Sequence, residues 1–423
     1  KEEVWERWTE SEDAWDYYIR GRKEAFRYGG YGERALRTGL ALLNKALELD
    51  SNFALPYANM ASINGRLYHF GFELSDSIKS LSKRLAERAG ELSEHVWVSN
   101  WPLARYYYFC EKNHDSALYY YEKAYRGDKN HVDYLACAHH CLRRMGRWQE
   151  AYDYMARIVE LEPKAEWYKL DLAANCFYMH RYEEAETLLK DAIDLSPSYW
   201  EANSVLFRLY LMWQGDFEKA RAVVRQSEGF IDSTRWTILL DWITNLEEGY
   251  AQATDVITMP PRDSLNYHYG LGMTYFRMGK IDSSRIHFRH MRNQYDRDVE
   301  RLRTDADLNR SYARMFAGLG ERELAIEHMN KALELIPPDK DALTHSDLFT
   351  FYPDIFALLG DTKTQVAYFD SLLSMPNRHT GLGLLLVDPD YKKAVLHPDF
   401  KAIMTKHADA IQWRLYETRF GSL

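Results

Sequence analysis

The sequence predicts an all-α protein, a right-handed α-solenoid of roughly ten helical hairpins with capping helices at both ends. The first observation is a repeat: small residues recur at intervals of 34, 34 and 35 residues, at Ala117, Ala151, Ala185 and Ala220. The second is that helix-breaking residues recur at the same place in successive units: Pro163 and Pro197 are again 34 residues apart. A simple helix bundle is the alternative arrangement.

The punctuation predicts two helices in each unit. Glycine at the end of a helix takes the left-handed conformation at little steric cost, and proline is tolerated at the start of a helix but not inside it. A single hairpin cannot bury its apolar stripe alone, so neighbouring hairpins are expected to stack and share one core.

The same frame continues toward the C-terminus, although its spacing stretches to 41 and 40 residues. Its markers there are Gly279 with Ser284, Gly320 with Ala325, and Gly360 with Gln365. The additional residues between the first two of these units, 293–310, carry charges of both signs. We expect them to extend a helix into solvent.

Weaker hairpins complete the predicted organisation. They are expected at Asp16–Leu49, Phe53–Leu92, Thr234–Ile257 and His345–Leu373. The predicted domains are therefore a solenoid over 1–379, with weaker repeats at 16–92 and 234–258, and a C-terminal cap over 380–423 packed on the last repeat. No β-strands are expected.

Composition excludes some classes of function. The 423 residues carry a net charge of −9, and lysine and arginine are scattered, so no nucleic-acid partner is expected for this segment. No apolar run approaches the ~18 residues of a membrane span. Four cysteines are too few for a disulfide scaffold and favour a reducing, cytoplasmic location. Because the chain begins with Lys1 and not methionine, an extracytoplasmic location stays open.

The repeat units resemble tetratricopeptide repeats. One unit has Trp101, Ala104, Tyr108, Ala117, Tyr121 and Ala124 at the positions of that family's pattern, and a second has Ala313, Phe316, Gly320, Ala325, Met329, Ala332 and Pro337. The resemblance implies a solenoid that binds proteins or peptides, and it extends over most of the chain.

The two ends resemble the repeat regions of large bacterial regulatory proteins. The motifs are the helix entry Tyr17-Tyr18-Ile19-Arg20-Gly21 and the terminal pair Asp388-Pro389 and His397-Pro398-Asp399-Phe400. In those proteins a winged-helix, nucleotide-cyclase or protein-kinase domain precedes the repeats. The resemblance implies that this segment senses a partner, which can be an upstream domain of the same polypeptide.

No catalytic, phosphate-binding or calcium motif is present, so neither an enzyme nor a cofactor is predicted. The glycine pairs Gly270-Leu-Gly272 and Gly381-Leu-Gly383 do not complete a dinucleotide loop and are interpreted as structural. Cys137, His139, His140 and Cys141 have the chemistry of metal ligands, but the repeat frame places them in the core, so packing is favoured over a metal site.

A partner-binding groove is predicted from side chains on the first helix of each unit. Its aromatic and apolar members suit a peptide, with glycan stacking or packing between repeats as alternatives. Arg310 and Arg314 can hold a carboxylate, although an ion-pair network with Asp305 and Asp307 is favoured. The predicted groove residues are His140, Arg143, Trp167, Phe177, Tyr178, Met212, Trp213, Tyr269, Met273, Phe276, Arg310 and Arg314.

The sequence therefore predicts a non-catalytic protein-interaction or sensory module of a larger bacterial regulator, which binds a peptide or protein in an aromatic concave groove. The alternative is an extracytoplasmic protein that binds glycans or envelope proteins.

Overall fold

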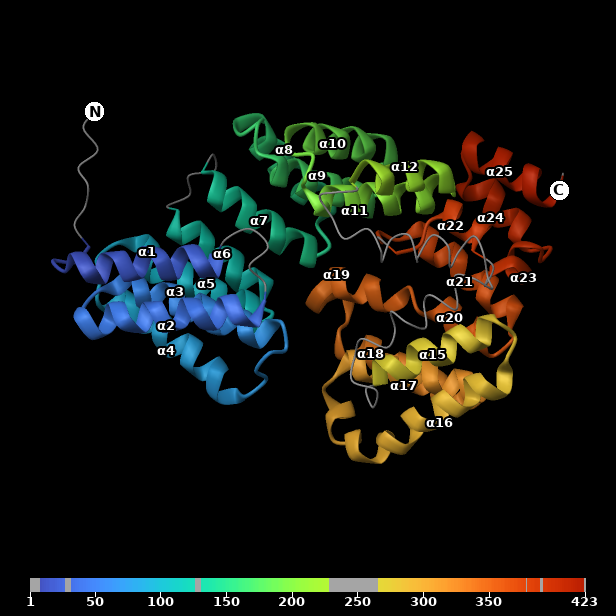
Figure 1. Ribbon diagram of the computed structural model, residues 1–423, viewed down its shortest axis with the longest axis horizontal. Coiled ribbons are helices and arrows are strands. Elements are labelled where there is room, and N and C mark those ends of the chain that lie inside the picture. Colours follow the sequence, from blue (N-terminus) through green and yellow to red (C-terminus); the bar gives the residue numbers. More distant parts are fainter. Residues whose placement is uncertain are drawn as a thin grey trace. The chain divides into compact units, whose positions relative to one another are not determined.

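The structure is a computed structural model that describes residues 8–26, 32–125, 131–227, 265–377, 379–388 and 391–421 (Figure 1). Throughout these ranges the secondary structure is helical, with turns between helices and no β-strand, so the all-α prediction is confirmed there. The hairpin expected at Thr234–Ile257 lies outside the described residues. The chain divides into two compact units, Lys1–Ile158 and Val159–Leu423.

The first unit contains hairpins that follow one another along the chain. Neighbouring helices pack in the pairs α1 with α2, α3 with α4, and α5 with α6. The helices are α1 (Glu12–Phe26), α2 (Glu33–Leu49), α3 (Ala54–His69), α4 (Asp76–Glu91), α5 (Val96–Tyr106) with its π-helical end η1 (Tyr107–Glu111), α6 (His114–Ala124), α7 (Val132–Arg144) and α8 (Trp148–Leu161), whose last turn crosses the unit boundary.

The second unit repeats this arrangement, with pairs α9 with α10, α15 with α16, α17 with α18, and α20 with α21. Its repeat helices are α9 (Glu166–Tyr178), α10 (Tyr182–Leu195), α11 (Trp200–Leu209) with η2 (Tyr210–Gln214), α12 (Phe217–Ser227), α15 (Leu265–Arg277), α16 (Ile281–Asp298), η3 (Arg301–Arg303), α17 (Ala306–Leu319), α18 (Arg322–Leu335), α19 (Pro338–Phe349), α20 (Tyr352–Leu358) and α21 (Thr362–Ser374). Consecutive pairing is the arrangement of a helical-repeat solenoid.

The small residues of the repeat frame mark the second helix of each pair. In α6, α8, α10, α12, α16, α18 and α21 the marker is the fourth residue of the helix, and its side chain is at most 2% exposed. These markers are Ala117, Ala151, Ala185, Ala220, Ser284, Ala325 and Gln365. Six of the seven markers are alanine or serine, whose small side chains let the two helices of a pair approach closely, which explains the period; Gln365 is the exception in size.

The turn before each of these helices has a left-handed residue five positions ahead of the marker. Glycine takes this position in five units, with φ between 60° and 83°, at Gly146, Gly215, Gly279, Gly320 and Gly360. Lys112 and His180 replace it in two units, with φ of 51° and 57°. The left-handed turn predicted from the glycine punctuation is present in all seven.

A helical C-terminal segment follows the repeats. It comprises α22 (Leu382–Val387), α23 (Lys392–Val395), α24 (Phe400–His407) and α25 (Ala410–Phe420). Its apolar side chains form one core cluster with Val366, Phe369 and Leu373 of α21. In the described part of the chain, no helix is both long and apolar enough to span a membrane.

Candidate functional site

Helix α17 carries the two arginines of the predicted groove. The Asp305 side chain caps its first turn by accepting a hydrogen bond from a backbone N–H. Its core face is fully buried at Tyr312 and Phe316. Arg310 and Arg314 are four residues apart, so they lie one turn apart on the remaining face of the helix.

The two guanidinium groups lie over aromatic rings from other segments of the chain. The Cζ atom of Arg314 is 3.9 Å from the ring centroid of Tyr269 on α15 and 4.6 Å from that of Phe351, between α19 and α20. The Cζ atom of Arg310 is also 4.6 Å from the Phe351 centroid. We call Tyr269, Arg310, Arg314 and Phe351 the arginine–aromatic cluster. Cation–π attraction holds both arginines in fixed positions.

Both arginines are partly removed from water. Their side chains are 27% and 16% exposed, and the Nε atom of each is buried without a hydrogen-bond partner. Arg310 Nη2 is 3.1 Å from Asp307 Oδ1, and Arg314 Nη2 is 3.6 Å from Asp354 Oδ2. Burial lowers the pKa of Arg310, Asp307 raises it, and the like charge of Arg314 lowers it further. Each of the two cations thus has one carboxylate partner, which offsets their mutual repulsion in this partly dry site.

A polar rim surrounds this cluster. The Tyr178 hydroxyl donates to Asp347 Oδ1 at 3.4 Å, and His379 Nε2 is 3.3 Å from the same oxygen. Asp347 acts electrostatically on Arg310. On the other side, the Tyr391 hydroxyl donates to Asp354 at 2.7 Å. Side chains from α9, α15, α17, α19, α20 and the C-terminal segment therefore meet around the two arginines.

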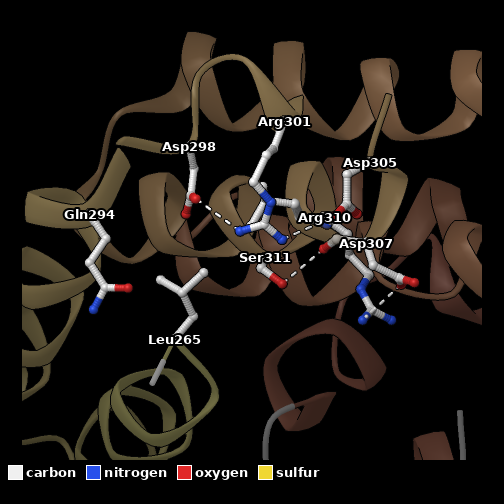
Figure 2. A pocket seen from close by; sticks show the side chains of 9 residues that line it. Leu265, Gln294, Asp298, Arg301, Asp305, Asp307, Arg310 and Ser311 are labelled. Carbon is white, nitrogen blue, oxygen red and sulfur yellow. Dashed lines mark hydrogen bonds and ion pairs between the residues drawn. The ribbon is translucent and has the colours of Figure 1, made fainter. Parts of the chain in front are cut away.

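An open, polar depression of about 570 Å³ adjoins Arg310. Figure 2 shows that charged side chains of both signs line it and that they are paired with one another. Arg301 bridges Asp298 at 2.9 Å and Asp305 at 3.5 Å, while Asp307 pairs with Arg310. Of the predicted network of Arg310 and Arg314 with Asp305 and Asp307, the pair of Arg310 with Asp307 is present, whereas Asp305 pairs with Arg301 and Arg314 pairs with Asp354.

The C-terminal segment covers two predicted groove residues, Met212 and Trp213, each only 4% exposed. Trp213 Nε1 donates to Asp409 Oδ2 at 3.0 Å, and Gln412 Nε2 donates to the Trp213 carbonyl at 2.8 Å. Gly383 lies against the Trp213 backbone so closely that a Cβ there would be 2.5 Å from its carbonyl carbon. These side chains contact the chain's own C-terminal segment.

The remaining predicted residues of the second unit lie in different environments. Phe177 and Met273 are 2% and 8% exposed and contribute to the packing of their hairpins. Phe276 is half-buried, and Trp167 is 39% exposed with its ring against Tyr168. Of the predicted set, the structure therefore brings Tyr269, Arg310 and Arg314 together, while Tyr178, only 1% exposed, is linked to them through Asp347.

Besides His379 and Tyr391, three rim and cluster residues were not predicted: Asp347, Phe351 and Asp354. They lie in or between α19 and α20, where two short helices replace the first helix of the regular pattern. Neither the repeat spacing nor a motif marks them. The closeness of Asp354 and Arg314, 40 residues apart in sequence, requires the tertiary structure.

His140 and Arg143 belong to the first unit, where both are half-buried. Burial, followed by the charge of Arg143, lowers the pKa of His140 to about 3, so this imidazole is neutral at physiological pH. The neighbouring cysteines are unpaired, and burial raises the pKa of Cys137 to about 11. Among the residues that the structure describes, no three His, Cys, Asp or Glu side chains form a group that could hold a metal ion.

No protein-family model matches this sequence, and no curated protein matches it. Among solved structures it is similar to YrrB, described as a TPR protein with an unusual peptide-binding site. The identity is 23%, the alignment covers 45% of this chain and 90% of YrrB, and the TM-score is 0.28. The description of this chain as an all-α protein of repeated hairpins therefore depends on its own helices and not on the similarity to YrrB.

Proposed function

We propose that this protein is a non-catalytic helical-repeat module that binds a peptide or protein partner, and that the arginine–aromatic cluster is part of its binding surface. The observation that supports the proposal is the pair of partly buried guanidinium groups stacked on Tyr269 and Phe351. Such an array suits a protein partner because arginine and aromatic side chains contribute most to interface energies.

The partner group that fits this cluster is a carboxylate. A guanidinium donates parallel hydrogen bonds to a carboxylate in a fixed plane, and stacking on a ring lowers the entropy cost of presenting that plane. Asp307, whose side chain is 77% exposed, holds the Arg310 contact from the solvent side and can rotate away. The carboxylate of an acidic peptide would then take its place.

The proposal also covers where the protein acts and what kind of protein it is part of. The segment would act in the cytoplasm as the partner-sensing arm of a larger bacterial regulator, and its partner would be a separate protein or an upstream domain of its own polypeptide. The unpaired cysteines are compatible with a reducing compartment. The alternative, extracytoplasmic glycan binding, draws on two exposed indoles of the second unit, Trp167 and Trp200, at 39% and 52% exposure.

A displayed library of random linear peptides tests the proposal. Peptides selected on the wild-type chain should be enriched in Asp and Glu, and Arg310→Ala or Arg314→Ala should weaken their binding roughly tenfold or more. Arg303→Ala is the matched control, because Arg303 is a 71% exposed arginine of the same segment. Its binding should equal that of the wild type.

Three results would contradict the proposal: no acidic enrichment, equal binding by all variants, or equal loss in the Arg303 control. Circular dichroism of each variant separates loss of binding from loss of fold. Binding of an oligosaccharide array that is lost on Trp167→Ala, with no selected peptide, would favour the glycan alternative.

A further inference from the structure

Arg143, on α7 of the first unit, is a partly buried cation without a counter-ion. It is half-buried, its Nε atom is buried without a hydrogen-bond partner, and it forms no ion pair with any residue that the structure describes. His140 stands three residues earlier, so the two side chains share one face of the helix. Because helical side chains lean toward the N-terminus of their helix, the Arg143 guanidinium is directed toward His140.

A second cation without a counter-ion, Arg105, reaches the same face of α7 from α5. Its Nε atom donates to the Ser62 hydroxyl at 2.9 Å, and its Cζ atom is 4.4 Å from the ring centroid of Phe109. The Tyr121 hydroxyl and the Cys137 thiol also act on it, and burial raises the pKa of both, so they are neutral at physiological pH. Within the described ranges no carboxylate pairs with Arg105.

His140 lies between these two arginines. Cys137, next to which Arg105 lies, is one turn before it on α7, and Arg143 is one turn after it, a span of roughly 9 Å along the helix. Burial, then the charges of Arg143 and Arg105, lower the pKa of His140 to about 3. The neutral ring carries one N–H group, and it forms no hydrogen bond with the residues described. This N–H is therefore available to a ligand.

The carboxylates that act on this face of α7 leave its positive charge uncompensated. Asp133 acts on Cys137 and Asp115 acts on Cys141, but neither pairs with either arginine. In the arginine–aromatic cluster, by contrast, each guanidinium has a carboxylate partner. A charge that is partly removed from water without a partner is costly, so these two cations favour a bound anion.

We propose that Arg105, His140 and Arg143 bind a phosphoryl group, which is either inorganic phosphate or a phosphate carried by a phosphorylated peptide. Each guanidinium offers a planar pair of N–H donors to phosphate oxygens, and the imidazole offers one more. A phosphoryl group carries a charge of about −1.5 to −2 at pH 7, which matches two unpaired arginines better than the single charge of a carboxylate. The site lies in the first unit and does not depend on the proposed function.

Calorimetric titration of sodium phosphate into the full chain at pH 7 and fixed ionic strength tests this proposal. The expected result is one phosphate bound per chain, with a Kd raised roughly tenfold or more by Arg143→Met, which removes the charge and keeps an unbranched side chain. Arg147→Met is the matched control. It removes the same charge from the neighbouring turn, where Arg147 pairs with Glu150 at 2.6 Å, and it should bind phosphate like the wild type.

A short alanine peptide with one central phosphoserine, and its unphosphorylated form, separate the two sources of phosphate. Binding of the phosphopeptide tighter than that of inorganic phosphate, with no binding of the unphosphorylated form, assigns the site to a phosphorylated peptide. Weaker binding of the phosphopeptide assigns it to the free anion. Arg105→Lys keeps the charge but loses the planar donor pair, so it should weaken binding in either case.

Circular dichroism of each variant separates loss of binding from loss of fold, and Arg143→Met should fold like the wild type because Arg143 forms no hydrogen bond or ion pair with the described residues. The proposal is overturned if the wild type does not bind phosphate or if Arg143→Met binds it equally well. An equal loss in Arg147→Met, or acetate bound as tightly as phosphate, would also overturn it.

Discussion

Gly383→Ala tests whether the C-terminal segment is packed against η2 as closely as the structure has it. Gly383 lies inside α22, where alanine in place of glycine normally stabilises a helix by roughly 0.5–1 kcal/mol. In this protein the added Cβ would be 2.5 Å from the carbonyl carbon and oxygen of Trp213 and 2.6 Å from the backbone nitrogen of Gly215. All three atoms are backbone, so no side chain can move to relieve the overlap.

The expected loss of stability follows from the contacts that break when α22 is displaced from η2. Overpacking of this kind costs ~1–3 kcal/mol, and moving α22 outward also weakens the hydrogen bonds from Gln412 to Trp213 and from Trp213 to Asp409, each worth ~1 kcal/mol. After the gain in helix propensity is subtracted, we expect the free energy of unfolding of the second unit to fall by about 2 kcal/mol or more.

Hydrogen exchange resolved over peptides covering 210–227 and 382–387 measures this loss locally, and urea unfolding measures it for the whole chain. Gly279→Ala is the control: its Cβ would meet nothing within 4 Å, but its φ of 69° costs alanine about 1 kcal/mol. A Gly383→Ala protein as stable as the wild type, or more stable, would refute the reasoning.

Three further predictions concern the repeats, the cap of α17 and the acid limb of stability. Ala185→Trp should lower the stability measured by urea unfolding by ~1–3 kcal/mol or more, because Ala185 is 0% exposed between α9 and α10; an unchanged midpoint would show that the repeat register is wrong. Asp305→Ala should cost ~1 kcal/mol in the same assay through loss of the α17 cap, whereas the exposed Asp307→Ala should cost little; equal losses would argue against the cap. Lys406 and then His407 hold the pKa of Asp370 below its usual 3.8, so the contribution of this carboxylate to stability is complete above that pH and is lost as the pH falls through the lower folded-state value. Asp370→Asn should therefore flatten the acidic part of the curve of stability against pH. An unchanged curve at acidic pH would contradict this prediction.

The repeat period alone predicts most of the regular fold. A small residue that recurs every 34 residues, five positions after a glycine, is a local signal, since both requirements arise between two helices that are adjacent in sequence. Ala151, Ala220 and Ala325 accordingly each mark the fourth residue of a second helix. The same reasoning is less complete near α19 and α20, where two short helices break the pattern.

The candidate site was predictable only in part. Arg310, Arg314 and Tyr269 stand at first-helix positions that the period identifies, and the structure brings them together. Phe351, which both arginines contact, lies in an irregular connection that carries no repeat signal. Its role depends on how three successive hairpins pack, which local spacing does not encode.

The sequence by itself determined which segments become helices and how consecutive helices pair, because those choices depend on residues within one repeat. Only the tertiary structure decided which first-helix side chains reach solvent. Met212 and Trp213 occupy predicted groove positions, yet the C-terminal segment covers them through contacts such as that of Trp213 with Asp409, 196 residues later. Burial of a side chain depends on every segment that packs against it, and a segment so far along the chain leaves no mark on the local pattern.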